Sequence, residues 1–177
     1  MGNDEEGPGV SVAGPLTRYG IAVAVVTALI DQASKLYLLF VYDLPARGRV
    51  AVTPFLDFVF TKNTGISYGL FQGSSALWQW ALLAIKVAAV ALLAVWLARS
   101  TTRLTALSLG LIIGGAIGNA IDRLAYGFVA DFVLFHIDTA SWRFYWYVFN
   151  LADVAIVAGV IGLLYESVFS GRAVKAP

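Results

Sequence analysis

The sequence predicts a membrane all-α fold, with four transmembrane helices and a small β-structured platform between the first and the second helix. Of its 177 residues, 59% are hydrophobic and only 13% are charged, whereas a soluble domain is about half apolar and about a quarter charged. The mean hydropathy is +0.78. Such an excess of apolar side chains does not fit into one small water-soluble core, so the expected solvent is a lipid bilayer.

Both ends of the chain are expected to be tails, which leaves residues 18–170 as a single four-helix domain. Residues 1–17 are acidic and rich in Gly and Pro, a composition typical of disorder. They lack the basic start of a signal peptide, and no small-residue cleavage site follows the apolar run behind them. Residues 171–177 form the second, shorter tail.

Four apolar segments each come close to the ~20 residues that a helix needs to cross the hydrocarbon core. The third segment contains Gly114 and Gly118, a G-x-x-x-G spacing that lets two helix backbones approach closely. No sequence repeat relates the segments to one another. They cover approximately residues 19–41, 76–98, 104–121 and 148–169.

Two long connections, residues 43–74 and 122–147, fall on the same side of the membrane if four helices span it. In the first, apolar and polar residues alternate in places around Leu56, Phe58 and Phe60, between Pro and Gly residues, which predicts short strands. The second is rich in aromatic residues, as expected of a segment at the membrane interface. The basic residues divide evenly between the two sides, so charge leaves the orientation almost open, with a slight preference for cytoplasmic termini.

The composition excludes several kinds of site. The chain has no cysteine, which excludes disulfides, thiolate catalysis and Cys-ligated metals. His136 is its single histidine, which argues against a His-rich metal site. The net charge of +1 gives no reason to expect a nucleic-acid partner.

Charged residues inside the apolar segments need a role, because an Asp or Lys near the middle of a spanning helix costs roughly 2.5–3.5 kcal/mol on insertion scales. Asp31 and Lys35 are four residues apart and therefore lie on one helix face. They form either a neutralising pair inside the bundle or a direct contact to a substrate. Asn119, Asp122 and Arg123 close the third helix and indicate an interfacial ion pair or a clamp for the neighbouring loops.

Two acidic residues are candidates for catalysis. Asp131 is the only charge between Arg123 and His136, and Asp153 is expected about one and a half turns inside the fourth helix, one turn after Asn150. Both should lie just below the same membrane surface. Two carboxyl groups in a dry site cannot both ionise cheaply, so one of them keeps its proton. The pair would then supply a general base and a general acid around one water, as hydrolysis of an amide without a covalent intermediate requires.

A competing pattern is the stretch from Gly65 to Gly69, which fits the G-x-S-x-G turn that exposes the nucleophilic serine of many hydrolases. Ser67 would need a base within hydrogen-bond reach, either His136 or a lysine. It also follows turn-forming residues and belongs to no strand-to-helix unit. We interpret the match as accidental and His136 as an interfacial residue.

Five motifs, taken in order, resemble the lipoprotein signal peptidases (signal peptidase II): "DQASK", "KNTGISYGLF", "GGAIGNAIDRL", "VADF" and "FNLADVAI". The resemblance implies an aspartic endopeptidase of the bacterial cytoplasmic (inner) membrane. In that family the enzyme removes signal peptides from diacylglyceryl-modified prolipoproteins and cleaves just before the lipidated cysteine. The two catalytic residues of the family match Asp131 and Asp153 here.

The resemblance also implies an orientation and further roles. The family fold has four transmembrane helices, a β-structured platform on the periplasmic membrane surface, and a second outer loop that gates the site. Both termini are cytoplasmic, and the active site lies near the periplasmic surface. No cofactor or metal is implied; the expected partners are the prolipoprotein and membrane lipid, and the expected state is a monomer. Supporting or substrate-positioning roles fall on Asp31, Lys35, Asn63, Gly65, Gly115, Asn119, Asp122, Arg123, Asn150 and Ala152.

An alternative hypothesis, from another functional class, is a small proton- or ion-coupled transporter that uses Asp31, Lys35 and Asp153 as a relay. Two observations oppose it. The polar residues gather near one membrane surface, and a transporter more often shows paired repeats or helices broken at mid-depth.

Overall fold

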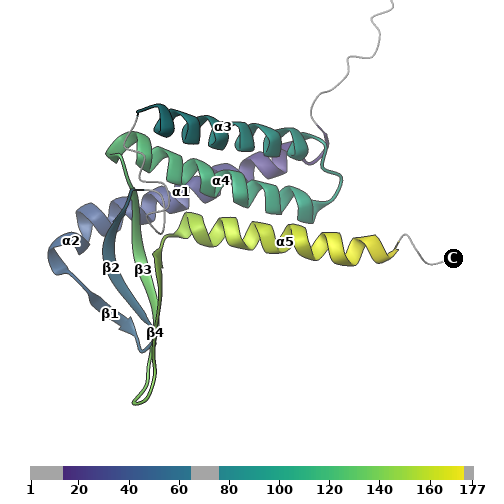
Figure 1. The fold of residues 1–177 in the computed structure, drawn as a ribbon. Helices are drawn as coiled ribbons and strands as arrows, with labels where there is room; N and C mark the ends of the chain where they lie inside the picture. Colours follow the sequence, from purple (N-terminus) through teal and green to yellow (C-terminus); the bar gives the residue numbers. More distant parts are fainter. Residues whose placement is uncertain (1–13, 65–75, 174–177) are drawn as a thin grey trace, which may run out of the picture.

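The computed structural model describes residues 14–64 and 76–173 of the chain. Its long helices lie side by side, and a small sheet projects from one end of them (Figure 1). In chain order the elements are α1 (Thr17–Leu36), the π-helical segment η1 (Tyr37–Val41), α2 (Leu44–Arg47), β1 (Val50–Thr53), β2 (Leu56–Asn63), α3 (Ala76–Ala98), α4 (Arg103–Tyr126), β3 (Val129–Asp138), β4 (Arg143–Phe149) and α5 (Leu151–Ala173).

Within the described residues, three helical segments are long and apolar enough to cross a membrane. They are α1 continued by η1, the whole of α4, and the Leu151–Phe169 part of α5. In α3 the apolar stretch found among the described residues is the shorter Val87–Ala98. The described part of the chain is therefore mostly helical, with three candidate membrane helices and one small sheet.

Helix α4 packs closely against α1 and α5 because glycines face both neighbours. A Cβ on Gly114 would lie 2.4 Å from the carbonyl oxygen of Ala24, and one on Gly118 would lie 2.5 Å from a carboxylate oxygen on α1. Toward α5, a Cβ on Gly115 would lie 2.5 Å from the carbonyl oxygen of Ala152. A side chain at any of the three would force the helices apart, so the G-x-x-x-G spacing serves packing within one molecule.

The four strands form one antiparallel sheet in the order β1-β2-β3-β4. Strands β1 and β2 come from the first long connection, as predicted. Strands β3 and β4 come from the second connection, where we expected a segment at the membrane interface and did not predict strands. Aromatic side chains are enriched both at membrane interfaces and in strands, so composition did not separate the two. The pairing of β2 with β3 places both connections at the same end of the bundle.

Strand β3 is regular and presents two different faces. Where its pairing with β2 and with β4 shifts register, the extra residue belongs to the neighbouring strand. Side chains on a regular strand alternate. Asp131 and Ile137 therefore lie on one face of the sheet, and His136 lies on the other.

Helix α5 starts later than the sequence predicts. Strand β4 continues to Phe149, and the helix begins at Leu151. Asp153 consequently lies in the first turn of α5 instead of one and a half turns inside it.

Helix α4 ends later than predicted, at Tyr126. Arg123 lies in the last turn of the helix and Asp122 directly before it, so both stand near its end, as predicted. Gly127 follows with a φ of 79°, a left-handed conformation that glycine adopts readily, and it turns the chain from α4 into β3.

Candidate active site

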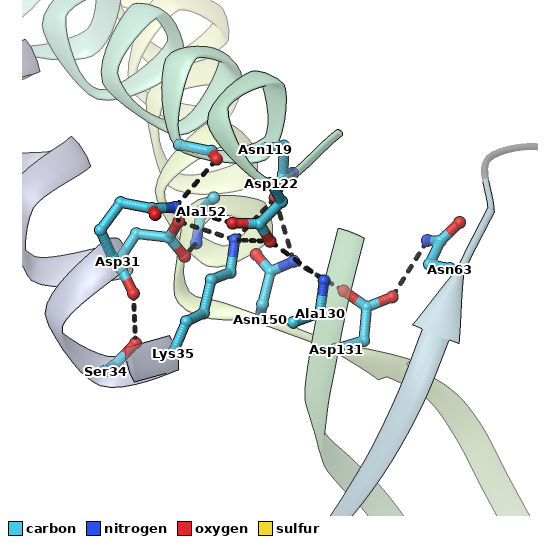
Figure 2. A network of polar contacts seen from close by, with 12 residues as sticks. Asp31, Ser34, Lys35, Asn63, Asn119, Asp122, Ala130, Asp131, Asn150 and Ala152 are labelled. Atoms are coloured by element: carbon cyan, nitrogen blue, oxygen red, sulfur yellow. Dashed lines mark hydrogen bonds and ion pairs between the residues drawn. The ribbon is translucent and has the colours of Figure 1, made fainter. Parts of the chain in front are cut away.

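A buried ion-pair network around Lys35 forms the base of the site (Figure 2). The Lys35 Nζ lies 2.7 Å from Asp31 Oδ2 and 2.8 Å from Asp122 Oδ2, and all three side chains are at most 2% exposed. Nζ also donates to Asn119 Oδ1 at 3.1 Å. An ammonium group has three hydrogens, and each has an acceptor here. Asp31 and Lys35 thus form a pair inside the bundle, with Asp122 as its third member.

The same carboxylates also hold two backbone segments in place. Asp31 Oδ1 accepts a hydrogen bond from the backbone N–H of Ala152 at 3.0 Å, and Asp122 Oδ2 accepts one from the backbone N–H of Ala130 at 3.0 Å. Each of these backbone groups immediately precedes one of the two candidate catalytic aspartates. The network therefore fixes the backbone from which both carboxyl groups project.

The start of helix α5 orients Asp153. Asn150 precedes the helix, and its Oδ1 accepts a hydrogen bond from the Asp153 N–H at 3.0 Å. In return, Asp153 Oδ2 accepts one from the Asn150 N–H at 3.2 Å. This reciprocal arrangement is a capping box, which satisfies backbone donors that a helix N-terminus leaves unpaired. The other carboxylate oxygen, Oδ1, accepts from Asn119 Nδ2 at 2.9 Å.

Asp131 projects from β3 and contacts two amide side chains. Asn150 Nδ2 donates to its Oδ1 at 2.6 Å, and Asn63 Nδ2, on β2, donates to its Oδ2 at 3.0 Å (Figure 2). Asn150 therefore contacts both candidate carboxyl groups, Asp131 through its side chain and Asp153 through its backbone. The two carboxyl groups thus share a hydrogen-bond donor residue, although one projects from the sheet and the other from a helix.

The environment of Asp131 favours its protonated form. Burial raises the pKa of the Asp131 carboxyl above its ordinary value; the hydrogen bonds from Asn63 and Asn150 oppose this shift, and the charge of Asp153 adds to it. Asp131 is 2% exposed. Arg123 is half-buried and close enough to interact electrostatically with Asp131 and Asp153. The site thus combines a protonation-prone carboxyl group, a second carboxyl group and a cation.

Most of the site residues predicted from the sequence come together in this region. Gly115 takes part through the close packing of α4 on Ala152. Gly65 and Ser67 lie outside the described residues, so the supporting role of Gly65 and the interpretation of the Ser67 motif as accidental both stay predictions. The residues joined by the contacts above are Asp31, Lys35, Asn63, Asn119, Asp122, Asp131, Asn150, Ala152 and Asp153.

Two contributors were not predicted. Gln32 donates through Nε2 to Asp122 Oδ1 at 2.8 Å and to the carbonyl oxygen of Gly118 at 3.0 Å. Its spacing of three residues before Lys35, which places both on one side of the helix, was a usable signal. Ala130 contributes its backbone N–H. Almost every residue type has this group, so the sequence could not indicate that Ala130 takes part.

His136 lies in a separate cluster on the sheet face opposite Asp131. Its Nε2 is 3.2 Å from Asp57 Oδ2 and its Nδ1 is 3.3 Å from Asp138 Oδ2. The ring stacks on Tyr145, with centroids 5.6 Å apart and planes 16° apart. His136 is thus engaged by strands β2, β3 and β4, away from the face that carries Asp131.

Comparisons with known proteins show which proteins this chain resembles. A lipoprotein signal peptidase of Nitrobacter hamburgensis is 64% identical over 160 residues, covering 90% of this chain and 98% of that protein. One of Methylocella silvestris is 55% identical over 153 residues, covering 86% and 87%. A solved bacterial membrane enzyme shares the fold with a TM-score of 0.68 at 23% identity, covering 90% of this chain and 92% of that one.

A second solved bacterial membrane enzyme has a TM-score of 0.66 at 24% identity, with coverage of 86% and 94%. The family model for signal peptidase (SPase) II matches residues 23–169, which is most of the chain. The match includes every candidate residue described above, from the ion-pair network on α1 to Asp153 on α5. The chain therefore belongs to the signal peptidase II family, the lipoprotein signal peptidases.

Proposed function

We propose that this peptidase, which removes signal peptides from lipoproteins, acts on diacylglyceryl-modified prolipoproteins and cleaves just before the lipidated cysteine. Asp131 and Asp153 are the proposed catalytic pair, and they activate one water between them. The observation that carries the assignment is the contact of both carboxyl groups with Asn150. Contact with a common residue places the two acids near each other, and the charge of Asp153 acts on Asp131, which supports a shared water and proton.

The proposed roles of the two acids follow from their surroundings. Asp131 is the protonated partner, because burial raises the pKa of its carboxyl group. Asp153 is the ionised partner, because it accepts hydrogen bonds from the Asn150 N–H and from Asn119 at the start of a helix, where a negative charge is favoured.

The chemical steps balance with these two groups and water alone. Asp153 takes a proton from water while the oxygen forms a bond to the scissile carbonyl carbon, and Asp131 donates its proton to the carbonyl oxygen. The tetrahedral intermediate then breaks its C–N bond. Asp153 passes its proton to the leaving cysteine amine, and Asp131 regains a proton from the intermediate. Because side chains and water carry every proton, the proposal includes no metal and no cofactor.

The proposed topology has four spans: the three candidate membrane helices described above and, in addition, α3 (Ala76–Ala98). Its 23 residues are enough to cross the hydrocarbon core. Four spans put both termini on one side, which we assign to the cytoplasm, and the sheet with the catalytic pair on the periplasmic side of the inner membrane. Residues 18–170 then form one membrane peptidase domain between cytoplasmic tails 1–17 and 171–177. A monomer is proposed because Gly114 and Gly118 are already used in packing α1 on α4.

We also propose that the sheet rests on the membrane surface. Phe144 pairs with Ile137, and both therefore share the Asp131 face. The ring of Trp142 stacks on Phe144 with centroids 5.6 Å apart, and Trp146 lies beside it at 5.8 Å. Aromatic side chains of this kind favour the lipid interface. The opposite face carries the His136 cluster together with the buried Phe132 and Leu134.

The position of the sheet supports this placement. It lies at the end of the bundle where α5 begins and extends sideways past that helix (Figure 1). Lipid would therefore occupy the space beside α5 under the sheet. A diacylglyceryl group could remain in that lipid while the adjacent peptide reaches the catalytic pair.

The transporter alternative is not favoured by the geometry. Asp31 and Lys35 are both engaged in the buried network and hold backbone on α5 and side chains on α4. The direct test of the proposed function uses purified protein in detergent with a diacylglyceryl-modified prolipoprotein. Mass spectrometry should show release of the signal peptide by the parent and none by Asp131→Asn or Asp153→Asn. Near-normal cleavage by both folded variants rejects the catalytic pair.

A further inference from the structure

Gln32 is a buried-network residue that the catalytic scheme above does not use. It lies on α1 between Asp31 and Lys35 in sequence, and its Nε2 donates to Asp122 Oδ1 at 2.8 Å and to the Gly118 carbonyl oxygen at 3.0 Å. An amide nitrogen carries two hydrogens, so both are directed at α4. A third contact, to Asp31 Oδ2, is longer at 3.4 Å.

Asp122 needs this donor because the nearby cation is already fully used. Lys35 directs its three hydrogens at Asp31, at Asp122 Oδ2 and at Asn119. Asp122 Oδ2 also accepts the Ala130 N–H. Among the described residues, the donor found for the other oxygen, Oδ1, is Gln32. A buried carboxylate oxygen without a donor is strongly disfavoured, so loss of this amide would force Asp122 to move or to bind a proton.

The neutrality of Gln32 also matters. Asp31 and Asp122 are two buried carboxylates that share one lysine. An uncharged donor satisfies the remaining oxygen of Asp122 and leaves the net charge of the network unchanged. A glutamate at the same place would add a third negative charge beside the other two.

We infer that Gln32 is a positioning residue for Asp131. It orients the Asp122 carboxylate, whose Oδ2 holds the backbone N–H of Ala130, and Ala130 is joined directly to Asp131. The inference rests on the proposed catalytic role of Asp131. Its effect should fall on the chemical step, because a small displacement of a catalytic group reduces the rate much more than it changes binding of a large lipidated substrate.

The first test replaces Gln32 with methionine, which has a similar length and no hydrogen-bond donor. Gln32→Met should lower kcat about tenfold with KM unchanged within about twofold. The matched control is Ser34→Ala, two residues further along α1, since the Ser34 hydroxyl donates to the Asp31 backbone carbonyl and not to a carboxylate. The control should keep kcat within about twofold of the parent. A parental kcat in folded Gln32→Met overturns the inference.

The second test uses pH as a readout that simple packing would not affect. A protonated glutamate can donate one hydrogen bond to Asp122, whereas an ionised one cannot. The activity of Gln32→Glu relative to the parent should therefore rise as pH falls. A ratio that stays constant across pH overturns the inference, even if Gln32→Met does not fold. The charged groups around this position are Asp31 and Lys35 on α1, Asp122 and Arg123 on α4, Asp131 on β3 and Asp153 on α5.

The third test asks whether Gln32 acts through Asp122. In an Asp122→Asn background, Gln32→Met should lower kcat by much less than tenfold, because the carboxylate that it orients has been removed. Equal effects in both backgrounds overturn the inference. Asp131→Asn is measured in parallel: an active Asp131→Asn rejects the catalytic pair itself, whereas an inactive one with parental Gln32→Met rejects only the role of Gln32.

Discussion

The Oδ1 of Asp31 on the first helix accepts a hydrogen bond from the backbone N–H of Ala152 on the last, 121 residues later in the chain. Its other oxygen is paired with Lys35 at 2.7 Å. One side chain therefore joins the two ends of the fold directly beneath the candidate catalytic pair. Stability and activity should consequently depend on the same residue.

Replacement of Asp31 by alanine should destabilise the protein by about 3 kcal/mol, because it removes one of the two carboxylates that pair with the buried Lys35 and leaves the buried Ala152 N–H without an acceptor. Thermal unfolding in detergent measures the change. A matched control is Leu29→Ala, at a side chain that is 63% exposed on the same helix. A midpoint for Asp31→Ala equal to that of the control would contradict the structural role.

Asp131→Asn and Asp153→Asn should each lower kcat at least about a hundredfold, since each removes a general acid or base. Both variants should still fold, which thermal unfolding checks, because asparagine keeps the shape of aspartate and one accepting oxygen. Asp138→Asn is the control, an exposed acid on the same strand as Asp131 but on the opposite face. If Asp138→Asn loses as much activity as Asp131→Asn, the effect is not specific to the proposed site.

The raised pKa of Asp131 predicts a definite pH dependence of stability. The folded chain holds this proton more tightly than the unfolded chain, whose ordinary value is 3.8. The stability from this group is therefore complete below that value and is lost as pH rises through the raised folded pKa. Asp131→Asn has no such loss.

As pH rises from about 4 to about 8, the thermal midpoint of Asp131→Asn should accordingly increase relative to that of the parent. Parallel melts in detergent buffers across this range provide the measurement. A shift in favour of the parent would mean that the folded environment stabilises the ionised carboxylate instead.

Gly114→Val should separate α1 from α4, because its Cβ would meet the Ala24 carbonyl oxygen at 2.4 Å. Overpacking of this kind costs about 1–3 kcal/mol. Thermal unfolding tests it, with Ala125→Val on the exposed side of α4 as the matched control. Equal midpoints for the two variants would show that the helices have room at this point.

Placement of the sheet on the membrane predicts contact between its aromatic strip and lipid. Brominated lipids should quench the tryptophan fluorescence of the parent in liposomes, and the quenched fraction should fall in a Trp142→Ser, Trp146→Ser double variant. Tyr145→Ser, an exposed aromatic on the opposite face of β4, should leave quenching unchanged. Equal quenching in parent and double variant would place the strip away from lipid.

The sequence predicted which acidic residues take part in the network more successfully than it predicted their hydrogen-bond and ion-pair partners. The helical spacing of Asp31 and Lys35 correctly indicated a pair, because periodicity reports which residues share a helix face. It could not indicate Asp122 as the third member, since that depends on how closely α4 approaches α1. Glycines permit that approach, and a glycine pattern alone does not specify which helix is the neighbour.

The differences between the predicted and the observed positions of the site residues come mostly from the sheet. Because β3 and β4 were not predicted, Asp131 was treated as a loop residue and Asp153 was placed deeper in its helix. The contact of Asn150 with both acids depends on β4 ending at Phe149 and α5 starting at Leu151. A shift of one residue at this boundary would remove the capping box, and element boundaries are poorly determined by local sequence.

The capping box at the start of α5 has a consequence for biosynthesis. Asn150 and Asp153 enter the chain only after the first three long helices have been made, and Asp31 must wait for Ala152 to complete its hydrogen bonds. A nascent polypeptide that stops before this point has one of the two acids and lacks the amide that joins them. If Asp131 and Asp153 are the catalytic pair, as proposed, proteolytic competence is acquired late, after the ribosome has synthesised the start of the last helix.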